Sequence, residues 1–475
     1  MQPTVGLAQH TLRRERKDEH PVTQPASTHY PPGPSYRDRM RNPGLLRLST
    51  HEFLERNAKT FGDLVHYKAF GRHVFQFNHP DMVHEVLVRD AAMQHRGIVM
   101  QRAKFVLGDG LLTSEEPLHM RQRRLVQPGF HRQRIAAYGE TMLQFADEMT
   151  ARWQSGSSFD IHRSMLELTL RITGKCLFDS DVESEVKTIS DSVTAFMGFL
   201  PLAFLPYPHL LLKIPFGFIG RIQKSQKKLD SLIYTMIAER RSSGVDHGDL
   251  LSMLLASQEG STGSMSAKQV RDECLTLLLA GHETTANGLS FIFFLMAQHP
   301  DVQEKVFAEA SSVFATASSN PRPTAADIYE RLPYSQRVVS EALRMYPPVW
   351  VTARSAAVPY AYRGLEIPAG SLLLVPQIAI HRDARWYPEP MHFNPDRFLP
   401  EAIAARPRHA YLPFGAGSRI CIGENFAWME AVLVLASVIR NWRLGFEGPI
   451  PTELPLSAQI SLRPRDPVAI SATKR

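Results

Sequence analysis

The sequence predicts a mainly α protein with small β regions, an α+β fold, and three observations support this. Helical patterns dominate from about residue 80 to residue 350. Within them, Ser266–Pro300 is apolar nearly all round in its second half, which is typical of a helix buried through the centre of a fold. Strand patterns lie outside that region, as a small hairpin at Asp63–Pro80 and as "LEIPAGSLLLVPQI" in the last third of the chain.

The helical elements follow from local patterns. Residues 184–197 and 221–241 carry apolar side chains at helical spacing and are expected to form amphipathic helices. The long helix is expected to begin at the N-cap Ser266 and to end at His299–Pro300. A last helix is expected at 424–442. Along the long helix, residues at helical spacing are expected to share one face; they are Leu275, Leu279, His282, Ala286, Leu289 and Phe293.

Composition places the chain among ordinary globular enzymes, with 44% hydrophobic and 21% charged residues in 475. Three widely spaced cysteines cannot build a disulfide framework, so a reducing, cytoplasmic location is expected. Cys176 and Cys274 lie among apolar residues and are expected to be inert core thiols. The net charge of +7 comes without a nucleic-acid-binding signature, so an acidic protein partner is favoured over nucleic acid.

The N-terminal residues show no signal peptide, because 1–30 lack an apolar core segment. They are expected to form a flexible tail, followed by a single domain over 31–475. The most apolar stretch, Ala195–Pro208, is too short for a membrane anchor and is broken by prolines. It is expected to be either a lid over an apolar pocket or a buried loop.

One cysteine stands in a different setting, the glycine-rich stretch "FGAGSRICIG". Gly415, Gly417 and Gly423 allow close backbone approach and positive φ around Cys421. Backbone N–H groups and a helix beginning at about Gly423 would stabilise a thiolate, which suits a nucleophile or a metal ligand. A buried thiol in a turn is the alternative. No second cysteine is close enough in sequence to pair with it on zinc.

The pattern Phe414-x-x-Gly417-x-Arg419-x-Cys421-x-Gly423 resembles the haem-binding loop of the cytochrome P450 monooxygenases. The resemblance implies that Cys421 is the axial thiolate ligand of haem b, where the sulfur favours O–O cleavage. It further implies that Arg419 pairs with a haem propionate and that Phe414 packs near the sulfur. The loop glycines, Gly415 among them, would admit the porphyrin.

The stretch "AGHETT" interrupts the long apolar helix with poor helix formers and a charge. Ala280 and Thr284 share a face, and a threonine can bond back to a carbonyl and open the helix locally. Taken alone, Glu283 is as well explained as a surface residue. The motif resembles the oxygen-activation groove of the same family. That resemblance makes Glu283 and Thr284 its catalytic acid and alcohol, with Ala280 and Gly281 leaving space over the haem.

Two further motifs match the family. Glu341 and Arg344 in "EALR" would be a commonplace ion pair alone. The resemblance adds Arg397 from "FNPDRF", giving a structural triad that anchors the cysteine loop. The family often has glutamate where this chain has Asp396, a mild departure.

The segment Gly108–His131 resembles the substrate loop and the helix that follows it. His119 and Arg123 would then face a haem propionate, and Leu112 would contact substrate beside Ala280. Arg354 matches another propionate arginine. The remaining basic residues nearby are expected either to form a solvated face or to dock an electron donor; they are Arg121, Arg124, Arg132 and Arg134.

The resemblance covers about residues 30–470 and implies haem held between the central helix and the cysteine loop. The expected reaction inserts one oxygen of O2 into a hydrophobic small molecule by hydroxylation or epoxidation. Fatty acid, terpenoid and steroid-like substrates all remain open. Because no flavin or iron–sulfur module follows Arg475, NAD(P)H electrons are expected through a separate ferredoxin- or flavodoxin-type donor and its reductase. A monomer is expected.

Two other classes stay open. A haem-thiolate isomerase or dehydratase would need no reductase, and the Glu283–Thr284 pair argues against it. A haem-binding sensor or carrier would need no proton-delivery pair.

Overall fold

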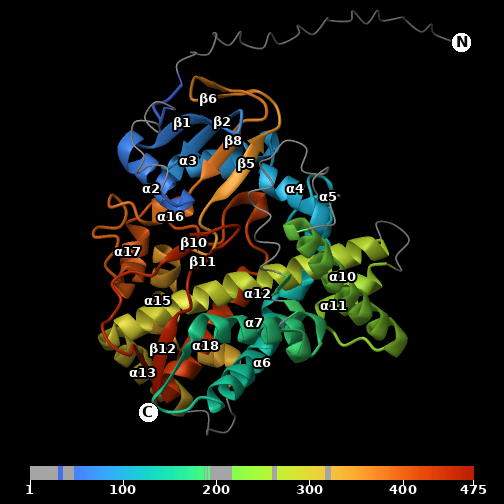
Figure 1. The fold of residues 1–475 in the computed structure, drawn as a ribbon, viewed down its shortest axis with the longest axis vertical. Coiled ribbons are helices and arrows are strands. Elements are labelled where there is room, and N and C mark those ends of the chain that lie inside the picture. The colour runs from blue at the N-terminus through green and yellow to red at the C-terminus, as the bar shows by residue number, and fades with distance from the viewer. Residues whose placement is uncertain are drawn as a thin grey trace, which may run out of the picture.

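The computed structural model describes residues 30–35, 48–186, 188–189, 191–192, 217–258, 265–315 and 323–475. They form a large helical part and a smaller part that contains a sheet, which lies at the top of Figure 1. The predicted mainly α architecture with small β regions is confirmed. The expected lid, Ala195–Pro208, lies outside the described residues, as does part of the predicted helix 184–197.

The helices of the described chain differ widely in length. The longer ones are α2 (Thr50–Phe61), α4 (Ile98–Leu107), α6 (Arg132–Ala151), α7 (Ile161–Phe178), α10 (Gly217–Ser243), α12 (Ala267–Gln298), α13 (Pro300–Ala315), α15 (Pro333–Met345) and α18 (Glu424–Asn441). The shorter ones are α3 (Pro80–His84), α5 (Leu118–Val126), α11 (Leu250–Ala256), α14 (Ala325–Glu330), α16 (Gln377–His381) and α17 (Pro400–Ala404).

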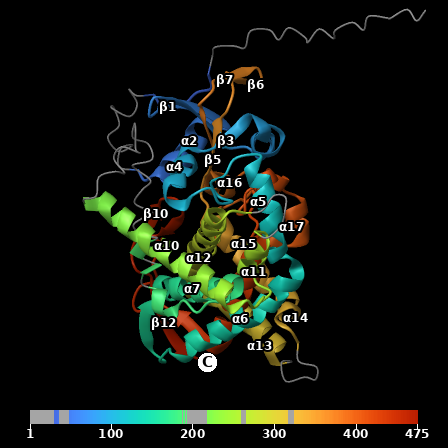
Figure 2. The same ribbon diagram turned by 90° about the vertical axis from the view of Figure 1, so that its right-hand side faces the viewer.

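The long predicted helix is α12, which runs through the middle of the helical part in Figure 1 and Figure 2. A capping box starts it: the Ser266 hydroxyl accepts from the Gln269 N–H, and the Gln269 side chain accepts from the Ser266 N–H. It ends before Pro300, which cannot continue the helical hydrogen bonds. The residues predicted to lie along one face of this helix, from Leu275 to Phe293, are buried except Leu279, which is partly buried.

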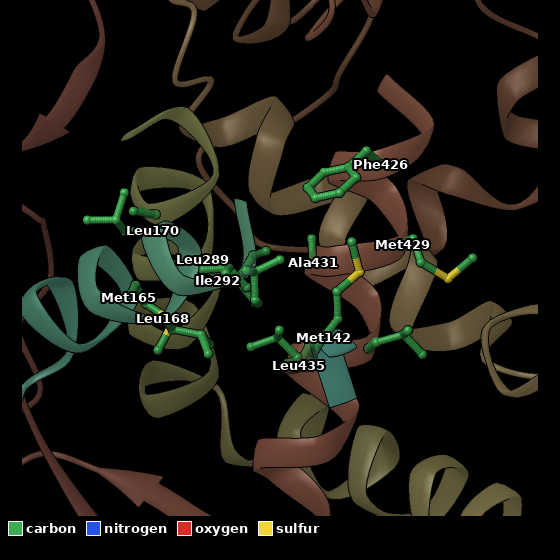
Figure 3. Packing of buried hydrophobic residues seen from close by; sticks show 14 of the residues in the cluster. Met142, Met165, Leu168, Leu170, Leu289, Ile292, Phe426, Met429, Ala431 and Leu435 are labelled. Carbon is green, nitrogen blue, oxygen red and sulfur yellow. The ribbon is translucent and has the colours of Figure 1, made fainter. Parts of the chain in front are cut away.

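Helices α7 and α18 pack against α12, and α6 packs against both of them. Figure 3 shows side chains from α6, α7, α12 and α18 meeting in one apolar cluster. Met142, Met165, Leu289, Ile292 and Leu435 are all fully buried there. Burial of such side chains is the main favourable term that holds the helices together. The cluster fixes α12 against α18, the helix that follows the cysteine loop.

The sheet joins segments that are far apart in the chain. The predicted hairpin is present as β1 (Leu64–Ala69) and β2 (Arg72–Phe77), and β2 pairs in parallel with β8 (Leu372–Val375). The strand order is β1-β2-β8-β5-β3. The remaining strands are β3 (Gln94–Arg96), β4 (Ser157–Asp160), β5 (Thr352–Ala356), β6 (Tyr360–Tyr362), β7 (Leu365–Ile367), β9 (Trp442–Gly445), β10 (Leu456–Ala458), β11 (Leu462–Pro464) and β12 (Ala469–Lys474).

No helix in the described part of the chain combines the length and the apolar character that crossing a bilayer requires.

Candidate active site

The cysteine loop lies between a short helical turn at Arg408–Ala410 and α18. Gly415 and Gly417 have φ of 77° and 75°, as predicted, and a Cβ on Gly417 would lie 2.2 Å from the Leu87 carbonyl oxygen. The same prediction is wrong for Gly423, whose φ is −89°. Gly423 is the N-cap of α18, a position that needs no left-handed conformation.

The loop backbone organises the sulfur of Cys421. The Cys421 N–H donates to the Phe414 carbonyl at 3.0 Å, and the Gly423 N–H bonds to the sulfur. Burial raises the thiol pKa to about 11 and Glu424 adds to this, while Gly423 and the charge of Arg123 lower it. A thiol with this pKa is protonated at neutral pH. A bound metal cation displaces that proton, because a coordinating thiol is deprotonated outright.

The other two cysteines behave as predicted for core thiols. Cys176 and Cys274 are buried, and burial raises the pKa of both well above the usual range, whereas Cys421 is accessible. Within the described residues, no group of three or more histidine, cysteine, aspartate or glutamate side chains is placed to hold a metal ion. A metal at Cys421 must therefore bring most of its other ligands with it, as iron does in a porphyrin.

Three arginines lie close together beside the loop, and few negatively charged side chains compensate their charge. Arg96 on β3 lies directly opposite Arg354 on β5, and like charges placed opposite each other are destabilising. Burial and the charge of Arg419 lower the pKa of Arg354 to about 10. Arg96 is buried, its pKa is lowered for the same two reasons, and its Nε has no partner in the structure. One carboxylate, Glu115, pairs with Arg419 at 3.1 Å.

Helix α5 adds two predicted residues to the same region. His119 is buried, with Nδ1 2.8 Å from Glu116, and burial together with the charge of Arg419 lowers its pKa. Arg123 donates to the Ile420 carbonyl at 2.8 Å, which ties α5 to the cysteine loop.

This residue set fits haem. Buried cations that outnumber their carboxylates need an anionic ligand, and the two propionates of haem supply one. Cys421 supplies the single ligand that a porphyrin iron needs from the protein on one face. Arg96 was missed by the sequence reasoning. No local sequence pattern points to Arg96, because only the pairing of β3 with β5 places it opposite Arg354.

The long helix α12 carries the segment in which the groove is predicted. Ala280 is exposed and Gly281 and Thr284 are partly so, although most of α12 around them is buried. The Thr284 hydroxyl donates to the Ala280 carbonyl at 2.6 Å, the back-bond expected from the sequence. This face is where α12 is open to a ligand.

Glu283 is buried and not a surface residue. The Ser461 hydroxyl donates to its Oε1 at 2.7 Å. Burial raises the pKa of Glu283, while the hydrogen bond from Ser461 and the charge of Arg463 lower it. Burial thus disfavours the charged form of this carboxyl group, and the hydrogen bond from Ser461 favours it.

The predicted substrate loop is fastened to α12 by two carboxylates. Asp272 accepts from the Asp109 N–H at 2.9 Å, and Glu273 accepts from the Leu111 N–H at 3.0 Å. Leu112 follows directly and is partly buried against the apolar core. These two hydrogen bonds hold the loop that carries Leu112 against the first half of α12.

The predicted triad comes together in space. Arg344 makes two hydrogen bonds to Glu341, at 2.7 and 2.9 Å, and both side chains are fully buried. Arg397 lies 3.3 Å from the same carboxylate. The carboxylate also accepts from the Asn394 N–H at 3.0 Å, so it holds the segment that leads to the cysteine loop.

A family model and several known proteins resemble this chain over most of its length. A family model described as Cytochrome P450 matches residues 31–469. Cyclooctatin synthase of Streptomyces melanosporofaciens is 36% identical over 447 residues, covering 90% of this chain and 93% of that protein. Cyclooctat-9-en-7-ol 5-monooxygenase of the same organism is 33% identical, covering 81% and 83%. Pentalenene oxygenase of Streptomyces avermitilis is 31% identical, covering 81% and 85%.

The chain belongs to the cytochrome P450 family. It is a haem-iron monooxygenase that uses O2.

The triad gives a stability prediction. Glu341→Gln leaves the buried Arg344 without its counter-charge and should lower the free energy of unfolding by about 3–5 kcal/mol. Glu330→Gln is the matched control, because its pair with Arg132 is exposed and should be worth about 0–1 kcal/mol. Urea unfolding followed by circular dichroism measures both. Equal losses in the two variants would contradict an anchoring role for Glu341.

Proposed function

We propose that this P450 oxygenates a cyclic terpenoid, by hydroxylation or epoxidation. Its electrons come from NAD(P)H through a separate acidic ferredoxin- or flavodoxin-type protein and a reductase. The names of the three relatives carry the choice of substrate class, because cyclooctatin and pentalenene are terpenoids. A fatty acid or a steroid has no comparable support. Two of the names describe oxygenases, which argues against an isomerase or a carrier.

The residues around the cysteine loop are proposed to bind the haem. Cys421 provides the thiolate, and Arg96, Arg354 and Arg419 with His119 bind the two propionates. The haem, when bound, supplies the activation of O2 and the oxidation of the substrate. Arg123 fixes α5 against the cysteine loop through the Ile420 carbonyl.

Residues on α12 are proposed to deliver protons, and residues on α12 and the substrate loop are proposed to contact the substrate. Thr284 holds a hydroxyl at the open face of the helix, and Glu283 beside it holds and releases a proton. Leu112 and Ala280 present apolar surface to the substrate. An apolar lining excludes water, which strengthens each polar interaction inside the site.

Exposed cations support the choice of electron donor. Arg121 and Arg124 lie exposed on α5, the helix that contacts the cysteine loop, and Arg132 is exposed at the start of α6. A basic surface beside the loop attracts an acidic partner and orients it. The protein is further proposed to be cytoplasmic and to be a monomer.

The thiolate assignment is tested by spectroscopy. Cys421→Ala should abolish the thiolate-type absorption of the reduced carbon-monoxide complex, because the variant has no sulfur ligand for the iron. Cys176→Ala removes a buried thiol elsewhere and should leave the spectrum unchanged. A thiolate-type spectrum that survives in Cys421→Ala would refute the assignment.

The substrate class is tested by the spin-state shift of the ferric enzyme. Pentalenene and cyclooctat-9-en-7-ol should give saturable shifts at lower concentration than dodecanoic acid or progesterone, by about tenfold or more. Tighter binding of the fatty acid or the steroid would overturn the terpenoid proposal and leave the reaction class in place.

The role of Thr284 is tested by coupling. Thr284→Ala should retain haem and substrate binding but divert NAD(P)H electrons into peroxide, with product per electron falling about tenfold or more. Thr284→Ser keeps the hydroxyl and should stay close to the wild type. Full coupling in Thr284→Ala would count against the proton-handling role.

A further inference from the structure

The carboxyl group of Glu283 is the last member of a chain of hydrogen bonds that connects α7, α12 and the turn between β10 and β11. Ser461 lies in the turn between β10 and β11, and its hydroxyl donates to Glu283 at 2.7 Å. Asn287, one turn after Glu283 on α12, donates from its amide nitrogen to the Ser461 hydroxyl at 3.2 Å. The Asn287 amide oxygen lies 3.0 Å from Nε2 of His162, at the start of α7. Because an amide oxygen only accepts, His162 is the donor.

The chain has a direction. His162 donates to Asn287, Asn287 donates to Ser461, and Ser461 is left with its own proton pointing at Glu283. A serine hydroxyl alone can rotate to accept or to donate. One of its two lone pairs accepts from Asn287, and its proton is directed at the Glu283 carboxylate.

The turn that carries Ser461 is held in place on both sides. The Trp350 indole N–H donates to the Gln459 carbonyl at 3.0 Å, and the Leu462 N–H donates to the Pro348 carbonyl at 2.8 Å. The Gln459 N–H also bonds to the Ser461 carbonyl at 3.0 Å. A supporting group that is locked in this way fixes the orientation of the residue it contacts.

The other end of the chain is anchored as well. The Asp160 carboxylate accepts from the backbone N–H groups of His162 and Val468, at 3.1 and 3.0 Å. His162 is partly exposed, while Asn287, Ser461 and Glu283 are buried.

We propose that Ser461 is a positioning residue for Glu283, set by Asn287 and His162, and that it controls how readily Glu283 gives up and regains its proton. This rests on the proposed proton role of Glu283. Asn287 does not pass protons itself, since an amide nitrogen does not ionise near neutral pH. The chain instead fixes the geometry and the proton affinity of Glu283.

The charges that face this carboxyl support the assignment. Arg463 on β11 acts on both Glu283 and His162, and Asp160 acts on His162. Burial raises the pKa of Glu283, and Ser461, Arg463 and Asn287 oppose that rise. Loss of the Ser461 hydroxyl therefore moves the titration of Glu283 upward, because the charged form loses a donor.

The test compares Ser461→Ala, Ser461→Thr and Ser290→Ala in the haem-loaded enzyme. Ser290 is the matched control, a buried serine on α12 whose hydroxyl donates to the Ala286 carbonyl of its own helix. The first readout is the infrared band of protonated Glu283, assigned by its loss in Glu283→Gln and titrated with pH. Ser461→Ala should move the midpoint up by about one pH unit. Ser461→Thr and Ser290→Ala should leave it in place.

The second readout is coupling of NAD(P)H consumption to oxidation of pentalenene or cyclooctat-9-en-7-ol, whichever gives the larger spin-state shift. Ser461→Ala should lose about tenfold in product per electron, and Ser461→Thr should restore it. An unchanged midpoint and full coupling in Ser461→Ala, while Glu283→Gln uncouples, would overturn the inference and leave the proposed function standing. Full coupling in Glu283→Gln would refute the proton role of Glu283 and the inference with it.

Discussion

The burial of α12 along most of its length is the constraint on which the site depends. A helix in the middle of a protein leaves its polar side chains little water to bind, so they need partners within the protein, and several of these partners lie on other elements. These partners connect the helix to the segments that surround the reaction. They are Asp230 for Arg271, the backbone of Asp109 and Leu111 for Asp272 and Glu273, and Ser461 for Glu283.

The cysteine loop and the arginines beside it would make haem part of the structure as well as of the chemistry. In addition to burial, the charge of Arg419 lowers the pKa of both Arg96 and Arg354, and the charge of Arg354 also lowers that of Arg96. A ligand that binds the folded state and cancels this repulsion stabilises that state through mass action. The same would hold for Cys421, since its pKa is raised and a bound iron would offset the cost of ionising the thiol.

The sequence predicts those parts of the site that are local. Cys421, Arg419, Glu283 and Thr284 lie in short motifs, and the back-bond of Thr284 follows from the four-residue spacing of a helix. Arg96 and Ser461 belong to the site only through strand register and a turn near the end of the chain. Neither leaves a local pattern, so sequence reasoning passed over both. The positive φ expected at Gly423 was wrong because that residue caps a helix and does not turn the chain.

The proposed terpenoid substrate would increase the importance of the groups around Glu283. An apolar substrate would exclude water from the site and would bring few exchangeable protons of its own. Protons for the reaction would then have to come through protein groups. A carboxyl serves this purpose when both of its protonation states are accessible. Burial disfavours the charged form of Glu283, while Ser461, Arg463 and Asn287 favour it. Ser461 contacts Glu283 from the β10–β11 turn and not from α12 itself. The proposed proton role of Glu283 would therefore depend on the position of a turn outside the helix.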